Sequence, residues 1–474
     1  MKSIKLIFSL LFVISISLSS SAQKEWSLED CINYAISNNI QVKRQELSAL
    51  SAEKTNFQSK MEIFPSLNAG GQHYLNSGKA INYETYTYVN ESFQGGNLSL
   101  TSELNLFNGL QTLNTIGKSK YDLMAQLQGV EKVKNDISLN VATAYLQILL
   151  SKELRDNAQK QVDITLEQIV KTKRLVEIGN AAKGDLLQIE AQAAGEMAAL
   201  TDAENNLKIS YLNLSQLLNL DTSEDFIIQI PENLEIELFG EFSGVDSIYS
   251  DALELLPEIK GAEYSLKSSE KNLAISYGRI SPTISLGYQY SSRYNELSNK
   301  VDDVSYVSST IGVTEISGEN VLSQMPMYTY ADSYPYMNQI SDNASHYVYV
   351  ALRIPIFNNW QTMNGVSQSK IMLQDSKLAL DLQKQNLYKS IQQARTQAIA
   401  ALDRYKANTQ AVVSMEEAFR YTEQKFQVGL VDILEYKTAK NNLNKTKSDA
   451  LQAKFEYIFR IKILDFYRGE QIVL

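Results

Sequence analysis

The clearest pattern of polar and apolar positions is a strict alternation in short stretches. It runs through 97–106 (NLSLTSELNL), 283–291 (TISLGYQYS) and 347–354 (YVYVALRI), and more weakly through 66–75. A period of two predicts β-strands with one apolar and one polar face. Strands of this length and pattern are typical of a transmembrane β-barrel, although a half-buried strand of a soluble sheet alternates in the same way.

The alternation assigns each strand residue to one face. The positions expected to face lipid are Leu98, Leu100, Leu104, Leu106, Ile284, Leu286, Val348, Val350 and Leu352. The positions expected to face a water-filled lumen are Ser99, Thr101, Glu103 and Asn105. Four strands cannot close a barrel, since natural barrels have about eight or more, and open edges are not tolerated in lipid. The chain is therefore expected to oligomerise.

Elsewhere the apolar residues follow helical spacing. No proline lies between Pro65 and Pro231 or after Pro355, which permits very long helices. The predicted helices are 28–64, 110–178, 185–220, 246–281, 359–428 and 432–468. The two longest would each extend ~100 Å at ~1.5 Å per residue. They show coiled-coil spacing, as at Val130, Val133, Ile137, Val141, Ala144 and Ile148.

The helices are expected to form hairpins. Gly179 and Gly429 each follow a long helix and mark its end, because glycine tolerates the backbone conformation that terminates helices. The two shorter helices of each half match the long helix in summed length. Stacked end to end, they could run antiparallel to it.

The chain is also an internal duplication. IFPSL at 63–67 returns as ISPTI at 280–284, and LNLFN at 104–108 returns as IPIFN at 354–358. We predict a first structural repeat at 23–221, a linker at 222–245 and a second repeat at 246–474. The second repeat contains a long, Tyr-rich loop at 292–345, which is expected to be extracellular. Duplication of so long a unit favours a quasi-symmetric assembly over a catalytic domain with one cleft.

The N-terminus predicts export. Lys2 and Lys5 precede an apolar run and the small residues Ser20-Ser21-Ala22, so residues 1–22 have the form of a secretory signal peptide. Beyond it, no stretch approaches the ~20 apolar residues of a spanning helix. Cys31 is the only cysteine, so an internal disulfide cannot form.

The composition offers little for catalysis. The chain has two histidines and lacks the HExxH, CxxC, P-loop and GxSxG motifs, so neither an enzyme nor a metal or cofactor site is expected. The net charge of -10 argues against nucleic acid as a partner. The 27 tyrosines, with many Asn, Gln and Ser residues, suit wet walls and membrane interfaces.

Several segments together resemble the TolC family of outer-membrane efflux proteins. They are WSLEDC at 26–31 with Ala35 and Asn38-Asn39, FPSL at 64–67, LFNG at 106–109 and VGLVDIL at 428–434. The resemblance covers essentially the whole mature chain. It implies a homotrimer with a 12-stranded transmembrane β-barrel, and long helical hairpins forming an α-helical tunnel through the periplasm. It also implies a periplasmic adaptor (membrane fusion protein) and an inner-membrane RND or ABC-type transporter as partners.

The resemblance also suggests functional residues at the hairpin tips. The family's acidic ring at the tunnel entrance maps onto Asp432 and Glu435, with Asp185 in the equivalent place of the first repeat. Gly179, Gly429 and Leu430 mark the turns expected to contact the adaptor. One departure is that Gly429 precedes Asp432 by three residues, whereas Gly179 precedes Asp185 by six. The polar gate network of some members is therefore not carried over.

The sequence thus predicts an outer-membrane exit duct of a tripartite efflux or type I secretion system in a Gram-negative cell. Its fold class is mainly α with a β-barrel part. The main alternative is a periplasmic coiled-coil adaptor or structural protein without a barrel. Drugs, metal ions and polypeptides all stay open as cargo.

Overall fold

The computed structural model describes residues 25–82, 87–220, 226–230, 243–470 and 472. The predicted signal peptide at 1–22 lies outside these residues, as does most of the predicted linker. The chain divides into two compact units. A helical unit comprises the described residues within Met1–Lys54, Lys120–Ser268 and Leu373–Leu474, and a strand unit comprises those within Thr55–Ser119 and Ser269–Met372.

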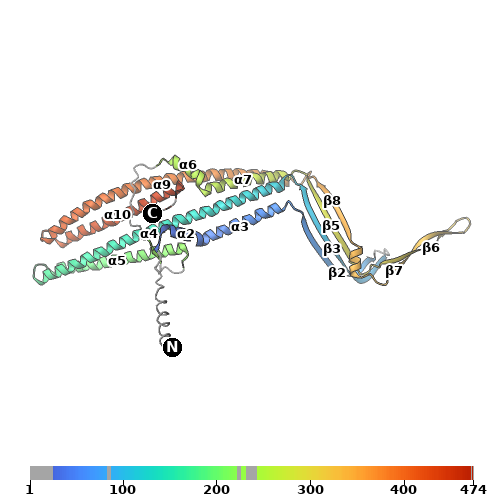
Figure 1. The fold of residues 1–474 in the computed structure, drawn as a ribbon, viewed down its shortest axis with the longest axis horizontal. Helices are drawn as coiled ribbons and strands as arrows, with labels where there is room; N and C mark the ends of the chain where they lie inside the picture. The colour runs from blue at the N-terminus through green and yellow to red at the C-terminus, as the bar shows by residue number, and fades with distance from the viewer. Residues whose placement is uncertain (1–24, 83–86, 221–225, 231–242, 471, 473–474) are drawn as a thin grey trace, which may run out of the picture. The chain divides into compact units, whose positions relative to one another are not determined.

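Both halves of the chain contain two short helices, then strands, then a long helix and a shorter helix (Figure 1). In the first half these are α2 (Leu28–Asn38), α3 (Ile40–Met61), β2 (Ser66–Asn82), β3 (Thr87–Phe107), α4 (Gln111–Glu177) and α5 (Lys183–Leu218). In the second half they are α6 (Val245–Leu255), α7 (Pro257–Gly278), β5 (Thr283–Asn295), β8 (Ser345–Arg353), α9 (Gln361–Gln427) and α10 (Ile433–Tyr467).

The first predicted helix of each half is in fact two helices. Asn39 separates α2 from α3, where its side chain accepts a hydrogen bond from Gln41 N at 2.8 Å and donates one to Leu217 O at 3.2 Å. Leu256 separates α6 from α7 in an extended conformation, because the following Pro257 disfavours a helical backbone at the residue before it. The prediction of continuous helices at 28–64 and 246–281 was therefore wrong.

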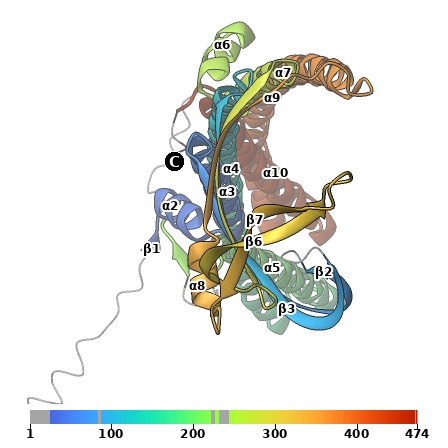
Figure 2. The ribbon, with the colours of Figure 1, turned by 90° about the vertical axis from the view of Figure 1, so that its right-hand side faces the viewer.

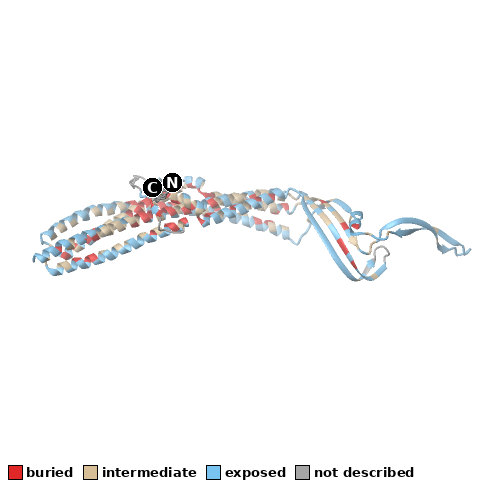
Figure 3. Cartoon of the chain, turned by 60° about the horizontal axis from the view of Figure 1, so that its bottom comes forward, coloured by how far each residue is buried: buried red, intermediate tan, exposed pale blue. Residues whose placement is uncertain are grey.

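The core of the helical unit lies along α4 and α9 (Figure 3). The first core joins α2, α4, α5 and α10 around Cys31, Val141, Tyr145 and Leu214. The second joins α6, α7, α9 and α10 around Ile259 and other buried residues. The predicted coiled-coil positions Val130, Ile137, Val141 and Ile148 are all buried, which confirms that stripe as core.

A short parallel sheet closes the first core. β1 (Glu25–Trp26) pairs with β4 (Ile227–Ile228), and β1 lies beside α2 (Figure 2). The Tyr145 hydroxyl donates a hydrogen bond to the backbone oxygen of Gln229, the residue that follows β4. Burial raises the pKa of Tyr145 well above its usual value, so the phenol stays protonated as a donor.

The strand unit contains a four-stranded antiparallel sheet in the order β2-β3-β5-β8. β2 and β3 extend well beyond the strands predicted at 66–75 and 97–106. The predicted loop at 292–345 contains the hairpin β6 (Val301–Val313) and β7 (Asn320–Tyr330), followed by α8 (Tyr336–Asp342). That hairpin is exposed along nearly its whole length (Figure 3).

Two buried hydroxyl pairs occupy the same place in both halves of the strand unit. The hydroxyl oxygens of Ser59 and Ser119 lie 2.6 Å apart and join α3 to α4, and those of Ser276 and Ser369 lie 2.7 Å apart and join α7 to α9.

Within the described part of the chain, none of the helices combines the length and hydropathy needed to span a bilayer.

Candidate functional site: hairpin tips and sheet faces

Two glycines turn the helical hairpins. Gly179 and Gly429 have φ values of 83° and 76°, in the left-handed region that glycine adopts without strain. Asn180 N donates to Leu175 O at 2.8 Å, and Leu430 N donates to Lys425 O at 2.9 Å. These bonds satisfy the last carbonyls of α4 and α9 as in a Schellman motif. The side chain of Leu430 is 75% exposed at the turn.

The two turns have the same length, and this corrects the spacing inferred from the sequence. α5 begins after Ala182 and α10 begins after Asp432, each three residues past the glycine. Asp185 is therefore equivalent to Glu435, and Ala182 is equivalent to Asp432. The interval from Gly179 to Asp185 ends on the third residue of α5, whereas the interval from Gly429 to Asp432 ends on the N-cap of α10. The two intervals therefore differ although the two helices start at the same distance from their glycines.

The carboxylates at the tips bond to helix N-termini. Asp432 caps α10 by accepting a hydrogen bond from Glu435 N at 2.8 Å. Asp185 accepts one from Ala182 N at 3.3 Å. Both bonds satisfy amide groups that a helix start leaves unpaired, and negative charge there also suits the helix dipole. The side chains of Asp432 and Glu435 are exposed.

Just behind the carboxylates, an apolar cluster joins the two hairpins. Ile189 of α5 packs with Ile433 and Tyr436 of α10, and with partly buried side chains of α4 and α9. The ring of Phe426 stacks on that of Tyr436, with centroids 4.7 Å apart. Burial raises the pKa of Tyr436 to about 12, so its phenol is neutral at ordinary pH. The cluster brings the starts of α5 and α10 together.

A buried ion pair lies one turn further along α10. The Lys440 ammonium is 3.1 Å from Glu196 Oε1 of α5 and donates to the hydroxyl of Thr165 on α4. Gln192 donates to the same Glu196 oxygen at 2.9 Å. Only 3% of the Lys440 side chain and 14% of the Glu196 side chain are exposed. A buried charge persists only when it is paired and hydrogen-bonded in this way.

Our sequence reasoning missed this pair, although one signal was present. Ile433, Tyr436, Lys440 and Leu443 are all buried and follow one another at intervals of three or four residues. A lysine in such a stripe indicates a polar partner across the helix interface. The partner itself, Glu196, is distant in the sequence and could not be identified from spacing.

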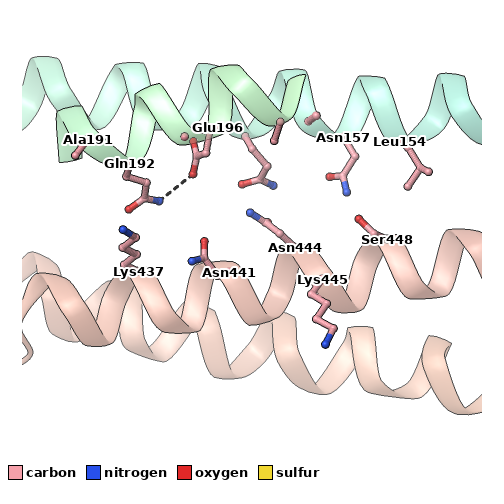
Figure 4. A pocket seen from close by; sticks show the side chains of 14 residues that line it. Leu154, Asn157, Ala191, Gln192, Glu196, Lys437, Asn441, Asn444, Lys445 and Ser448 are labelled. Atoms are coloured by element: carbon pink, nitrogen blue, oxygen red, sulfur yellow. Dashed lines mark hydrogen bonds between the residues drawn. The ribbon is translucent and has the colours of Figure 1, made fainter. Parts of the chain in front are cut away.

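Beside the ion pair runs a polar groove of about 410 Å³ between α10 and the α4–α5 hairpin. Figure 4 shows Lys437, Asn441 and Asn444 extending from α10 toward the other wall, where Gln192 and Asn157 lie. Asn444 Oδ1 is buried and has no hydrogen-bond partner among the described residues.

The register of the sheet sorts the predicted strand residues onto two faces. Leu100 pairs with Tyr290, Leu104 with Leu286, and Leu286 in turn with Val350. These residues share one face with Leu98, Ile284, Val348 and Leu352. Ser99, Thr101, Glu103 and Asn105 lie on the opposite face, beside Ser285 and Gln289. The apolar face is uncovered in the single chain, where 67% of Val350 is exposed.

Leu106 departs from the predicted alternation. A β-bulge between Asn105 and Phe107 shifts the register, so that Phe107, not Leu106, pairs with Ile284. The extra residue of a bulge interrupts the two-residue period. On the same apolar face, near the start of β8, the Tyr288 hydroxyl is 3.0 Å from His346 Nδ1, and the Tyr290 ring lies beside His346. Aromatic residues form girdles at the membrane interfaces of outer-membrane barrels.

Comparison with known proteins agrees with this architecture. The family model described as "Outer membrane efflux protein" matches residues 31–220 and 248–458. The outer membrane protein TolC of Vibrio cholerae is 21% identical over 459 residues, covering 94% of this chain and 92% of that protein. The cation efflux system protein CusC of Escherichia coli K12 is 20% identical, covering 90% of this chain and 82% of that protein.

Solved structures show the same fold at low identity. A structure of CusC aligns with a TM-score of 0.75 at 16% identity, covering 96% of each chain. The outer membrane protein VceC from Vibrio cholerae aligns with a TM-score of 0.72 at 13% identity, covering 94% of this chain. Because the family model matches most of the chain in two pieces, this protein belongs to the outer membrane efflux protein family and is an outer-membrane channel of efflux systems.

Proposed function

We propose that this protein is the passive exit duct of a tripartite efflux or type I secretion system. It would receive cargo from an inner-membrane RND or ABC-type transporter through a periplasmic adaptor and perform no chemistry itself. The observation that carries the proposal is the amphipathic sheet β2-β3-β5-β8, whose two outer strands each have a partner on one side only among the described residues.

The unpaired edges argue for assembly. β2 and β8 each have one neighbour within the sheet, so each presents a row of unpaired backbone groups. In lipid such groups cost several kcal/mol each, and only a closed barrel satisfies them all. Pairing β8 of one copy with β2 of the next closes the sheet. We propose three copies and 12 strands, as the family resemblance implies.

The two faces supply the lipid contact and the lumen. The face with Leu100, Leu104, Leu286 and Val350 would contact lipid. Lipid chains solvate an apolar surface of this kind, whereas its exposure to water is unfavourable. The face with Thr101, Glu103 and Gln289 would line a wet path. Tyr288, Tyr290 and His346 would lie at the interface with the outer leaflet.

The hairpin tips would form the periplasmic entrance. Three copies around one axis would bring together the carboxylates of Asp185, Asp432 and Glu435, and rings of acid side chains select cations. The turns at Gly179 and Gly429, with the exposed Leu430, would contact the adaptor. The capping bonds of Asp432 and Asp185 support a second role for two of these acids, in starting the helices.

Planar-bilayer recording of the purified protein tests the proposal. A duct gives stable, ohmic conductance steps, and the same preparation migrates on gels as a heat-modifiable oligomer. An adaptor or structural coiled-coil protein without a barrel gives neither result, so a silent bilayer with an unmodified band would reject the duct.

A further inference from the structure

We infer that Tyr347, Tyr349 and Glu103 form a binding site for organic cations on the polar face of the sheet. The inference rests on the proposed function, because it requires that face to line the lumen. It goes further by giving the duct a chemical preference within the strand unit, far along the sequence from the acidic tips.

A glycine lets one of the two rings lie across the sheet. Tyr349 of β8 pairs with Gly287 of β5, and a Cβ at Gly287 would collide with the phenol ring of Tyr349. The ring thus occupies the side-chain space of Gly287 on the polar face. Neighbouring strands are about 4.8 Å apart, so a phenol that crosses one strand points toward the next.

The next strand carries a carboxylate in the same row. Gly287 pairs on its other side with Glu103 of β3, which puts Glu103, Gly287 and Tyr349 in one line across the sheet. Glu103 is exposed, and among the described residues its carboxylate makes no ion pair. The nearest cationic side chain on the same face of β8 belongs to Arg353, two rows away in register with Thr283.

A second ring extends the aromatic surface. Tyr347 lies in the adjacent row, opposite Gln289, and its ring stacks on that of Tyr349 with centroids 5.3 Å apart and planes inclined by 25°. Tyr347 is 59% exposed. Two stacked rings in line with a carboxylate that makes no ion pair among the described residues match a positively charged group that also carries apolar or aromatic surface.

The physical basis is the attraction of a cation to the face of an aromatic ring. That attraction contributes about 0.5–2 kcal/mol depending on desolvation, and it is the basis on which aromatic sites bind quaternary ammonium groups. A nearby carboxylate adds Coulomb attraction, which is stronger in a confined lumen than in bulk water. The competing explanation is that Tyr349 only stabilises the sheet by covering a strand glycine.

Open-channel block in planar bilayers tests the site. Benzyltrimethylammonium is the probe, and benzenesulfonate is the anionic control with the same ring. We expect benzyltrimethylammonium to block the wild-type pore in a voltage-dependent manner, and benzenesulfonate not to block it. Tyr349→Ala should weaken the block about tenfold, and Glu103→Gln about fivefold. Tyr349→Phe keeps the ring and should remain within about twofold of wild type.

Tyr288→Ala is the matched control, because Tyr288 is next to Gly287 on β5 but lies on the opposite face. It should leave the block unchanged. Heat-modifiable migration checks that each variant assembles. If benzyltrimethylammonium blocks the Tyr349→Ala pore as strongly as it blocks the Tyr288→Ala pore, the rings serve only to stabilise the sheet and the binding site is rejected. If the wild type forms no pore, the proposed function fails and the site fails with it.

Discussion

At the residue scale, Asp432 combines two physical roles that can be separated. Its carboxylate caps α10, and its charge lies at the proposed entrance. Asparagine caps a helix about as well as aspartate does but carries no charge. The same separation is impossible with alanine, which removes the charge and the cap together.

We therefore expect Asp432→Asn combined with Glu435→Gln to lower the cation preference of the pore while leaving the helix start intact. Reversal potentials in asymmetric KCl measure the preference. Asp432→Ala should additionally cost about 1 kcal/mol of helix stability. An unchanged reversal potential in the Asn/Gln variant would mean that these carboxylates serve the helix terminus only.

Lys440 and Glu196 show the second effect at this scale, a buried charge that depends on its partner. Replacing Lys440 alone by Met leaves the Glu196 carboxylate buried without its cation, which typically costs about 3 kcal/mol or more. Replacing both partners by Met removes the unpaired charge. The double variant should therefore be more stable than the single variant.

Thermal unfolding followed by circular dichroism in detergent measures this order. Lys447 and Glu416 provide the control, because their ion pair also involves α10 but is far more exposed than that of Lys440 and Glu196. Lys447→Met should change stability by about 1 kcal/mol or less. Equal losses for Lys440→Met and Lys447→Met would show that the buried pair contributes no more than the exposed one.

At the element scale, the strands combine a strict period with local exceptions. Alternation puts Leu100 and Thr101 on opposite faces of β3, and the bulge after Asn105 ends that period. In the helices, the comparable exceptions are Asn39 and Leu256, which divide the first helix of each half.

The period gives a paired prediction for β3. A lysine on the lipid face near the bilayer midplane costs about 2–4 kcal/mol, whereas lumen substitutions mainly change selectivity. Leu100→Lys should therefore lower the amount of assembled oligomer in the outer membrane. Thr101→Lys should assemble normally and shift conductance. Because a one-residue slip exchanges the faces, equal assembly or the reverse order would mean that these strands do not span a membrane as proposed.

At the scale of the whole molecule, the open outer edges of β2 and β8 are the strongest argument for several copies. Within one chain β3 and β5 separate them, which corresponds to about 14 Å between the two edges. A disulfide requires Cβ atoms about 4 Å apart. A disulfide between β2 and β8 must therefore join two chains, unless the sheet closes on itself.

Asn68→Cys is combined in turn with Tyr347→Cys, Tyr349→Cys and Ala351→Cys. We expect the pair whose two cysteines face each other across the β2–β8 contact to give covalent trimers. Non-reducing gels measure the product. The native thiol does not interfere, because Cys31 is buried. Covalent dimers as the largest species, or exclusively monomers, at every register tested would contradict a closed trimer.

The sequence by itself determined the long helices and, except at Leu106, the faces of the strands in the four-stranded sheet. These features depend on local periodicity, and the turns at Gly179 and Gly429 depend on a backbone conformation that glycine adopts readily. The duplicated order of segments led to the family, which the family model confirmed.

Only the tertiary structure decided which distant residues meet. It paired Lys440 with Glu196, laid Tyr349 across Gly287, and made Asp185 the counterpart of Glu435. It also gave strands and a helix to residues 292–345, which the sequence presented as a loop. The physical reason is that register, bulges and buried pairing depend on contacts between segments far apart in the chain, and a local period carries no information about them.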